Sequence, residues 1–282
     1  MSAVLYLGAC DGTGDGDAQF LVSAEESIAA GLEPGVGSEN IVDGWQVRYT
    51  QFLIVVGNFY AASTEAPSSP LQANGSWLVD LTRLPPTGVQ VASFPGVPGR
   101  RYDQVRYETP VATIATQVLD PALAPERDAM ASRGWSHSVV GTARKEGRTL
   151  RFAWGFAAPT RYDNCGPEEG DTGFAVPEGS SGQADFSLHG DHFWFNAFPG
   201  GSEAAIERRA EWLSRADGDS DGHVTLAELE ATSAALLFPN DRYELQGAPR
   251  PEGVRHGLDW VRGQAATLGH FQGEGECIWT VL

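Results

Sequence analysis

Residues 45–56 read WQVRYTQFLIVV, and this stretch gives the clearest indication of β structure in the sequence. In its first half apolar and polar side chains alternate, so that Trp45, Val47 and Tyr49 share one face, which is the period of a β-strand. Its second half, residues 52–56, is a fuller apolar run. The stretch therefore predicts a strand that joins a hydrophobic core.

Short segments of the same kind recur through the middle of the chain. Candidate strands lie at residues 77–81, 89–94, 102–107, 111–114, 135–140, 148–156 and 184–195. Turn-forming pairs such as Asn74-Gly75, Pro95-Gly96 and Glu146-Gly147 separate most of them. Many short strands with turns between them predict a mainly β protein, an antiparallel β-sandwich.

Helix-forming patterns gather in the last third of the chain. Candidate helices lie at residues 202–214, 226–237 and 258–268, after one short candidate at 24–32. The composition changes near Pro199-Gly200-Gly201. Three parts are expected: a signal remnant and flexible tether at residues 1–20, a β-sandwich domain at 21–199, and a helical segment with a C-terminal tail at 200–282.

Residues 217–228 read DGDSDGHVTLAE and match the twelve-residue loop of an EF-hand. Gly222 stands at the sharp turn of this loop. The expected calcium ligands are the side chains of Asp217, Asp219, Asp221 and Glu228, the backbone carbonyl of His223, and Thr225 through a water molecule. Four carboxylates this close repel one another unless a cation neutralises them. The sequence predicts one bound calcium ion. Calcium sensors usually contain paired EF-hands, so this single EF-hand is expected to have a structural role.

The chain is strongly acidic, with 37 Asp and Glu, 19 Lys and Arg, and a net charge of −18. This charge suits cation binding. No basic patch is visible in the sequence, so nucleic acid is not an expected partner. No run of 18 apolar residues occurs, so no internal transmembrane helix is expected.

The sequence contains no Gly-x-Ser-x-Gly elbow, Walker A motif, His-Glu-x-x-His pair or Cys-x-x-Cys pair. A binding protein without enzymatic activity is therefore expected, and the sequence does not indicate its protein partner. The alternative is a secreted hydrolase that uses two of the many carboxylates.

The first ten residues read MSAVLYLGAC, and their end, Leu7-Gly8-Ala9-Cys10, resembles the lipobox of bacterial lipoproteins. The resemblance implies a lipidated Cys10 and a protein held in the periplasm or cell envelope, in contact with the membrane only through its lipid anchor.

The other two cysteines, Cys165 and Cys277, lie in glycine-rich acidic stretches. An even number in an exported chain predicts a disulfide between them, and two unpaired buried thiols are the alternative.

Residues 188–193 read LHGDHF and place two imidazoles and a carboxylate within four residues. His189 and His192 are candidate ligands for copper or zinc, with His137 as a third. On a regular strand the first two would face opposite sides, so the site needs a bulge at Gly190. Otherwise the two are structural, as is expected for His256 and His270, which stand alone in the sequence.

Several short motifs resemble a known family. Residues 77–81 read WLVDL and residues 98–102 read PGRRY; residues 130–135, Gly141, the run RFAWGF at 151–156 and Cys165 follow. Over about residues 44–196 the chain is similar to the MbnP-like proteins, which implies a periplasmic protein associated with copper. It is also similar to predicted lipoproteins of Gram-negative bacteria that combine such a sandwich with an EF-hand loop.

Overall fold

A computed structural model describes residues 14–199, 206–249 and 252–282 of the chain, so Cys10 lies outside the described residues. The protein is mainly β. Its strands are β1 (Asp15–Ala24), β2 (Gln46–Ser63), β3 (Ala66–Asp80), β4 (Val89–Pro98), β5 (Arg100–Tyr102), β6 (Gln104–Thr109), β7 (Gln117–Val118), β8 (His137–Lys145), β9 (Arg148–Phe156), β10 (Thr160–Asp163), β11 (Phe174–Val176), β12 (Ser181–Leu188), β13 (His223–Val224) and β14 (Ile278–Val281). Its α-helices are α1 (Glu26–Ala30), α2 (Ala124–Arg133), α3 (Trp212–Ala216), α4 (Leu226–Ala231), α5 (Ala234–Leu237) and α6 (Gly257–Ala265).

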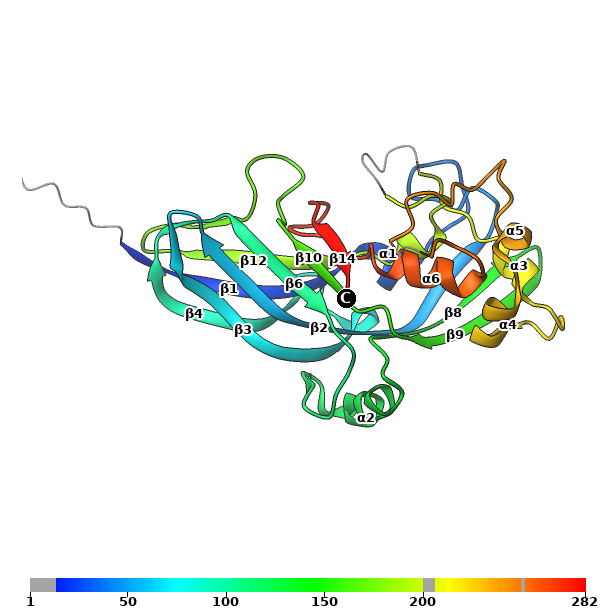
Figure 1. The fold of residues 1–282 in the computed structure, drawn as a ribbon, viewed down its shortest axis with the longest axis horizontal. Coiled ribbons are helices and arrows are strands. Elements are labelled where there is room, and N and C mark those ends of the chain that lie inside the picture. The colour runs from blue at the N-terminus through cyan, green and yellow to red at the C-terminus, as the bar shows by residue number, and fades with distance from the viewer. Residues whose placement is uncertain (1–13, 200–205, 250–251) are drawn as a thin grey trace, which may run out of the picture.

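The larger sheet is organised around β2, the strand that begins in the stretch WQVRYTQFLIVV and continues to Ser63. The strand order is β13-β9-β8-β2-β6-β10-β14, and β3 and β7 add to β2 on a branch. One side of β2 pairs first with β8 and, farther along, with β6, while its other side pairs with β3. Figure 1 shows this long strand running between the two ends of the molecule.

A three-stranded sheet of order β12-β1-β4 packs against the larger one. Phe59 on β2 lies with its ring 4.7 Å from that of Phe186 on β12 and 6.3 Å from that of Phe20 on β1, so aromatic side chains join the two sheets. The expected tether is wrong from Asp15 onward, because residues 15–20 form the start of β1 between two neighbouring strands.

The sheets are mixed. Most neighbours are antiparallel, as predicted, but β1 and β12, β13 and β9, and β3 and β7 pair in parallel. The predicted strand at residues 111–114 is wrong, since these residues form an irregular loop before β7. The predicted strand at 184–195 ends at Leu188, and the chain then turns into a 3₁₀ helix at Asp191–Trp194.

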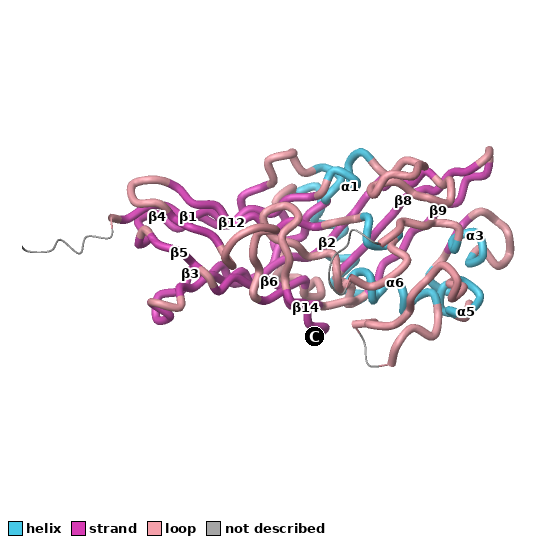
Figure 2. The backbone as a smooth tube through the Cα atoms, turned by 90° about the horizontal axis from the view of Figure 1, so that it is seen from above, coloured by secondary structure: helices cyan, strands magenta, loops and turns pink. Residues whose placement is uncertain are grey.

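The helices α3 to α6 lie beside β8 and β9 at one end of the molecule (Figures 1 and 2). Trp212 of α3 stacks on Trp154 of β9 with ring centroids 5.8 Å apart, and one hydrophobic core continues from the sheets into the helical segment. This segment also supplies two strands of the larger sheet, β13 and β14.

Two helix predictions need correction. Of the helix expected at 202–214, residues 202–205 lie outside the described residues, and residues 206–211 are not helical, because Arg208 instead forms backbone bridges with Ile41 and Phe195; the helix α3 begins at Trp212. The helix expected at 226–237 is divided into α4 and α5. Within the described residues, no helix is long and apolar enough to cross a membrane.

Candidate metal centres

The loop at residues 217–228 folds so that its carboxylates converge. One oxygen from each of Asp217, Asp219 and Glu228 lies within 4.8 Å of the others. Asp221 is outside this group, and its Oδ1 accepts a hydrogen bond from the backbone N–H of His223 at 2.7 Å. Gly222 turns the chain with a φ of +80°, a value that favours glycine. Three carboxylates at this spacing form an oxygen-rich site of the kind that calcium prefers.

Backbone N–H groups hold the last ligand position in place. Glu228 accepts hydrogen bonds from the N–H of Gly218 at 2.9 Å and from the N–H and hydroxyl of Thr225 at 2.8 and 2.9 Å. Burial raises the pKa of Glu228, but these bonds outweigh it, so that the pKa lies below its usual value. The carboxylate is therefore ionised and aimed into the loop. Thr225 also caps α4, and the side chain of His223 is exposed, as expected for a position that offers only its carbonyl.

The loop is attached directly to the larger sheet. Its short strand β13 pairs in parallel with β9, with His223 beside Arg151 and Val224 beside Phe152. Trp154 Nε1 donates a hydrogen bond to the carbonyl of Val224 at 2.9 Å, and Arg148 forms an ion pair with Asp217 at 3.1 Å.

Three histidines meet at the edge where several segments end. β1 and β12 run in parallel with Ala24 beside Leu188, so Glu25 and His189 follow side by side. The backbone of Leu188 bridges Gly269, which brings His270 to the same edge. The 3₁₀ helix then returns His192 towards both.

The bulge at Gly190 that a shared site was expected to need is not formed. This residue has φ −92° and ψ −13° and initiates the 3₁₀ helix. A Cβ at this position would lie 2.4 Å from Ile28 Cγ1, which explains why the position needs glycine. The turn places His189 and His192 on the same side, with ring centroids 5.8 Å apart.

The imidazole nitrogens of His189, His192 and His270 can all lie within 4.8 Å of one another, and all three residues are buried. His270 stacks on His189 with centroids 3.9 Å apart and is perpendicular to His192. His192 Nε2 and His270 Nε2 form a hydrogen bond at 3.2 Å. Two nitrogens bound to one tetrahedral metal at about 2.0–2.1 Å would be about 3.3 Å apart, so a metal ion that replaced the shared proton would need little change in this distance.

The hydrogen bonds of His192 indicate its tautomer. The hydroxyl of Thr267 donates to the carbonyl of Gln264 at 2.9 Å, so its oxygen accepts from His192 Nδ1–H, also at 2.9 Å. The lone pair of His192 is then on Nε2, the nitrogen that faces His270. Burial, with the neighbouring histidines, lowers the pKa of His192 and His270 well below the usual value. Both are neutral, which is the form that binds metal.

Acidic groups lie next to the histidines. Asp191 accepts a 2.7 Å hydrogen bond at Oδ2 from Arg208 Nε. Glu25 Oε2 accepts from the Ser27 hydroxyl at 2.5 Å and lies 4.0 Å from His189 Nδ1. Burial, followed by the nearby Asp191, raises the pKa of Glu25 to about 9. Sequence reasoning missed Glu25 and His270, because each is isolated in the sequence and only the strand pairing brings them together.

His137 is not part of this cluster. It is fully buried on β8, where its ring stacks on Phe156 at 5.3 Å. Ser136 Oγ accepts a hydrogen bond from the N–H of Ala158 at 2.9 Å and forms another with His137 Nδ1 at 2.7 Å. The prediction of His137 as the third ligand is replaced by His270.

Cys165 and Cys277 have sulfur atoms 2.08 Å apart, the disulfide predicted from the cysteine count. The bridge anchors the loop that follows His270. In this loop Gly273 accepts hydrogen bonds from the Ser187 hydroxyl at 2.7 Å and from His189 Nε2 at 3.1 Å. The exposed Glu274 of the same loop lies 3.8 Å from His189 Nδ1.

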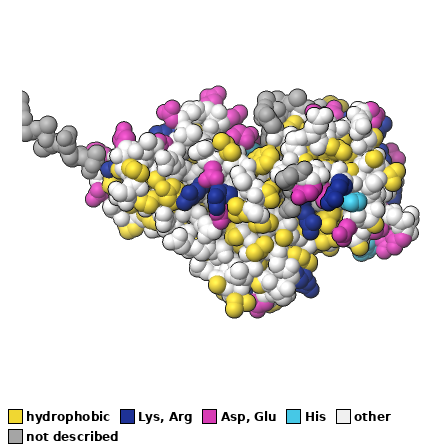
Figure 3. Space-filling model, viewed as in Figure 1, with side chains coloured by type: hydrophobic (Ala, Val, Ile, Leu, Met, Phe, Trp, Pro, Cys, Tyr) yellow, Lys and Arg dark blue, Asp and Glu magenta, His cyan; other side chains and the backbone are white. Residues whose placement is uncertain are grey.

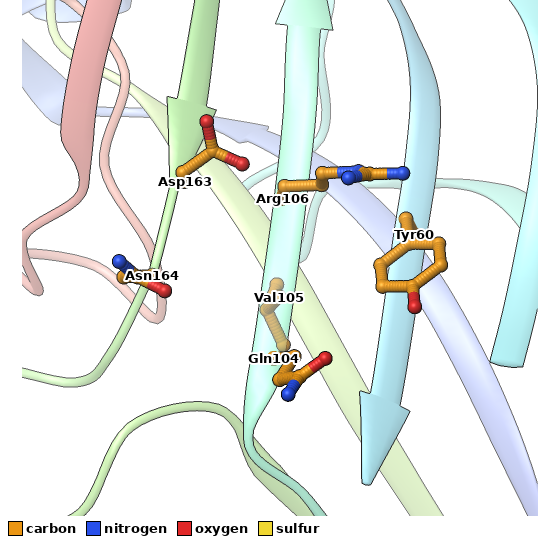
Figure 4. A pocket seen from close by; sticks show the side chains of 6 residues that line it. All are labelled: Tyr60, Gln104, Val105, Arg106, Asp163 and Asn164. Carbon is orange, nitrogen blue, oxygen red and sulfur yellow. The ribbon is translucent and has the colours of Figure 1, made fainter. Parts of the chain in front are cut away.

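A polar pocket on the outer face of β2, β6 and β10 is separate from these centres. Figure 4 shows its lining residues, among them Tyr60, Arg106 and Asp163. Arg106 covers the ring of Tyr60 at 4.1 Å, and basic side chains gather over this part of the visible face (Figure 3). Neither of the predicted sites has a residue in this pocket.

Comparison with known proteins identifies no relative: no family model, no curated protein and no solved structure matches this chain. The similarity to the MbnP-like family therefore stays a prediction.

Proposed function

We propose that this is an exported β-sandwich protein that binds one calcium ion in the loop at residues 217–228, where the ion fastens the helical segment to the sheet. The convergence of Asp217, Asp219 and Glu228 carries the proposal, because these carboxylates come within 4.8 Å of one another and need a cation to offset their repulsion. A structural role fits because β13 pairs with β9 of the sheet.

Calcium titration followed by thermal unfolding tests this site. A lone loop of this type has a dissociation constant of about 10⁻⁴ to 10⁻³ M. At about 10 mM calcium, mass action then stabilises the folded state by about 1.4–2.7 kcal/mol. Glu228→Gln, which removes a charge and the bidentate contact, should abolish most of this gain. Glu230→Gln is the matched control because it makes the same change on an exposed residue of α4. An unchanged melting curve of the wild-type protein in calcium would contradict the proposal.

Export and lipid anchoring are proposed from the lipobox-like sequence at Cys10, and the disulfide is in keeping with an oxidising compartment. Protein expressed behind a bacterial lipoprotein signal peptide that ends at Cys10 should partition into membranes, and Cys10→Ser should release it. Wild-type protein that stays in the aqueous fraction would argue against the anchor.

A second candidate function is the binding of copper or zinc by His189, His192 and His270. The specific observation in its favour is the 3.2 Å separation of the Nε2 atoms of His192 and His270, two buried histidines whose pKa is lowered by burial. Three nitrogen ligands with an open fourth position suit either metal. The site would make the protein a binder of transition metals in the cell envelope.

Metal titration of the calcium-loaded protein tests this second function. His192→Ala should weaken zinc and copper binding by at least 100-fold, because it removes one of three ligands. His256→Ala serves as the control, since that histidine has a side chain 43% exposed and lies outside the cluster. Equal binding by wild type and His192→Ala would end the proposal.

A further inference from the structure

Two adjoining pockets on the outer face of the larger sheet form a polar surface that neither proposed metal site uses. They share Tyr60 of β2 and Arg106 of β6, and their cavity volumes are about 200 and 350 Å³. Strand pairing places Tyr60 between Gln72 of β3 and Arg106, so these three side chains form a row across the sheet. β10 extends the row beyond β6, with Asp163 beside Arg106 (Figure 4). Four strands spaced about 4.8 Å apart make this row about 14 Å long, which is longer than a simple ion needs.

A β-bulge lies at the centre of this surface. β2 advances from Gly57 to Tyr60 while β6 advances only from Glu108 to Arg106, so β2 contains one extra residue. Asn58, inside the bulge, has a φ of +52°, a left-handed conformation that asparagine tolerates better than most residues. Its Nδ2 donates a hydrogen bond to Glu108 at 2.7 Å. Bulges of this kind redirect side chains and are common beside active sites.

The two arginines of this surface have different surroundings. Arg161 Nε donates to Glu108 at 2.9 Å, so its charge is paired. The guanidinium of Arg106 makes no ion pair and no hydrogen bond with any described residue, and it lies 4.1 Å from the centre of the Tyr60 ring. This is unusual in a chain with 37 acidic and 19 basic residues. Stacking on the ring orders the guanidinium, so Arg106 offers a positioned fork of N–H donors to an anion.

The groups around Arg106 indicate what kind of anion fits. The carboxylate of Asp163 forms no hydrogen bond or ion pair within the described part of the chain. The side-chain amides of Gln72 and Asn74 are exposed and make no hydrogen bond with a described residue either. A phosphate dianion would be repelled by the carboxylates beside Arg106. A ligand with hydroxyl groups can instead donate to Asp163 and bond the amides while its single carboxylate binds the guanidinium.

We propose that this surface binds an acidic sugar chain. A uronic acid unit places its carboxylate on Arg106, where two parallel N–H···O bonds fix its orientation. Hydroxyl groups of the chain bond Asp163 and the amides of Gln72 and Asn74, and the following sugar rings lie along the row of side chains. The site shares no residue with the calcium loop or the histidine cluster, so it is independent of both proposed functions.

Calorimetric titration with trigalacturonate in calcium-free buffer tests the proposal. The wild type should bind this ligand. Its methyl ester, which keeps the hydroxyl groups and loses the charges, should bind at least about tenfold more weakly, because hydrogen bonds to charged groups are strong. Arg106→Ala should cause a similar loss, and Arg106→Lys, which keeps the charge without the planar fork, a smaller one. Arg144→Ala is the control and should bind like the wild type, because it removes an exposed arginine of β8 outside this surface.

Thermal unfolding of each variant establishes that it is folded. No binding of trigalacturonate by the wild type at millimolar concentration would overturn the proposal. Equal affinity for the acid and its methyl ester would also overturn it, because the guanidinium would then play no part. Equal binding by the wild type and Arg106→Ala would place the ligand elsewhere, and an equal loss in Arg106→Ala and Arg144→Ala would reduce the effect to general charge. Either result would reject the site.

Discussion

The Cys165–Cys277 disulfide joins residues that are 112 positions apart in the chain. In the unfolded protein this bridge closes a large loop and removes much of its conformational freedom. For a loop of this size the chain-entropy model gives a stabilisation of about 4.8 kcal/mol. Cys165→Ala together with Cys277→Ala should therefore lower the free energy of unfolding by about this amount.

The expected change is large enough to measure by thermal unfolding. In a domain of this size, 1 kcal/mol corresponds to about 2–4 °C, so the double variant should melt about 10–20 °C below the wild type. All samples are measured at the same calcium concentration and without transition metals, because ligands shift the melting temperature.

The single variants provide the control. Each one already breaks the cross-link, so each should lose most of the stability, and the second substitution should cost little more. A double variant that melts within about 3 °C of the wild type would refute the entropic argument. Single effects that simply add would refute it too, because the losses would then come from packing around the two buried cysteines.

Three further substitutions test individual buried groups. His137→Phe should leave zinc binding unchanged and reduce the loss of stability in acid. Burial lowers the pKa of His137 from 6.5 to about 3, so the unfolded chain binds a proton that the native state does not, and stability is lost as the pH falls from 6.5 towards 3. Denaturant unfolding at pH 7 and pH 4 measures this, and equal acid losses in both proteins would contradict it. In metal-free protein, Glu25→Gln should stabilise more at pH 8 than at pH 5. The native state keeps a proton on Glu25 up to about pH 9, so the wild type loses stability as the pH rises from 4.5 to that value. A gain that does not depend on pH would argue against this. Gly190→Ala should destabilise by about 1–3 kcal/mol, because the added Cβ would overlap Ile28; an unchanged denaturation midpoint would show that the turn can adjust.

Features that depend on neighbouring residues could be predicted from the sequence. The candidate calcium loop is the clearest case, because its donors lie within twelve residues and the glycine at its turn has a local conformational cause. The strand at residues 45–56 is another, since the alternation of apolar and polar side chains directly indicates one buried face. The disulfide followed from the cysteine count, and the structure brings the two sulfur atoms together.

Two predictions from local sequence patterns were wrong, because contacts with distant parts of the chain determine the structure of these segments. Residues 15–20 are rich in glycine and aspartate at their start, which suggests a tether, yet they pair along both edges as β1. Residues 206–211 have helical spacing, but Arg208 forms backbone bridges on either side and donates to Asp191. In both cases long-range pairing outweighed local preference.

The histidine cluster shows where sequence reasoning ends. The segment at residues 188–193 suggested His189 and His192, but a regular strand would have separated them. The structure unites them because β12 ends at Leu188 and the chain turns into a 3₁₀ helix. His270 and Glu25 could not be predicted, because the parallel pairing of β1 with β12 and the bridge from Leu188 to Gly269 connect distant parts of the chain. The β character and the acidic loop follow from local spacing along the chain. Which imidazoles and carboxylates meet depends on the folded arrangement, because strand register places their side chains at one edge.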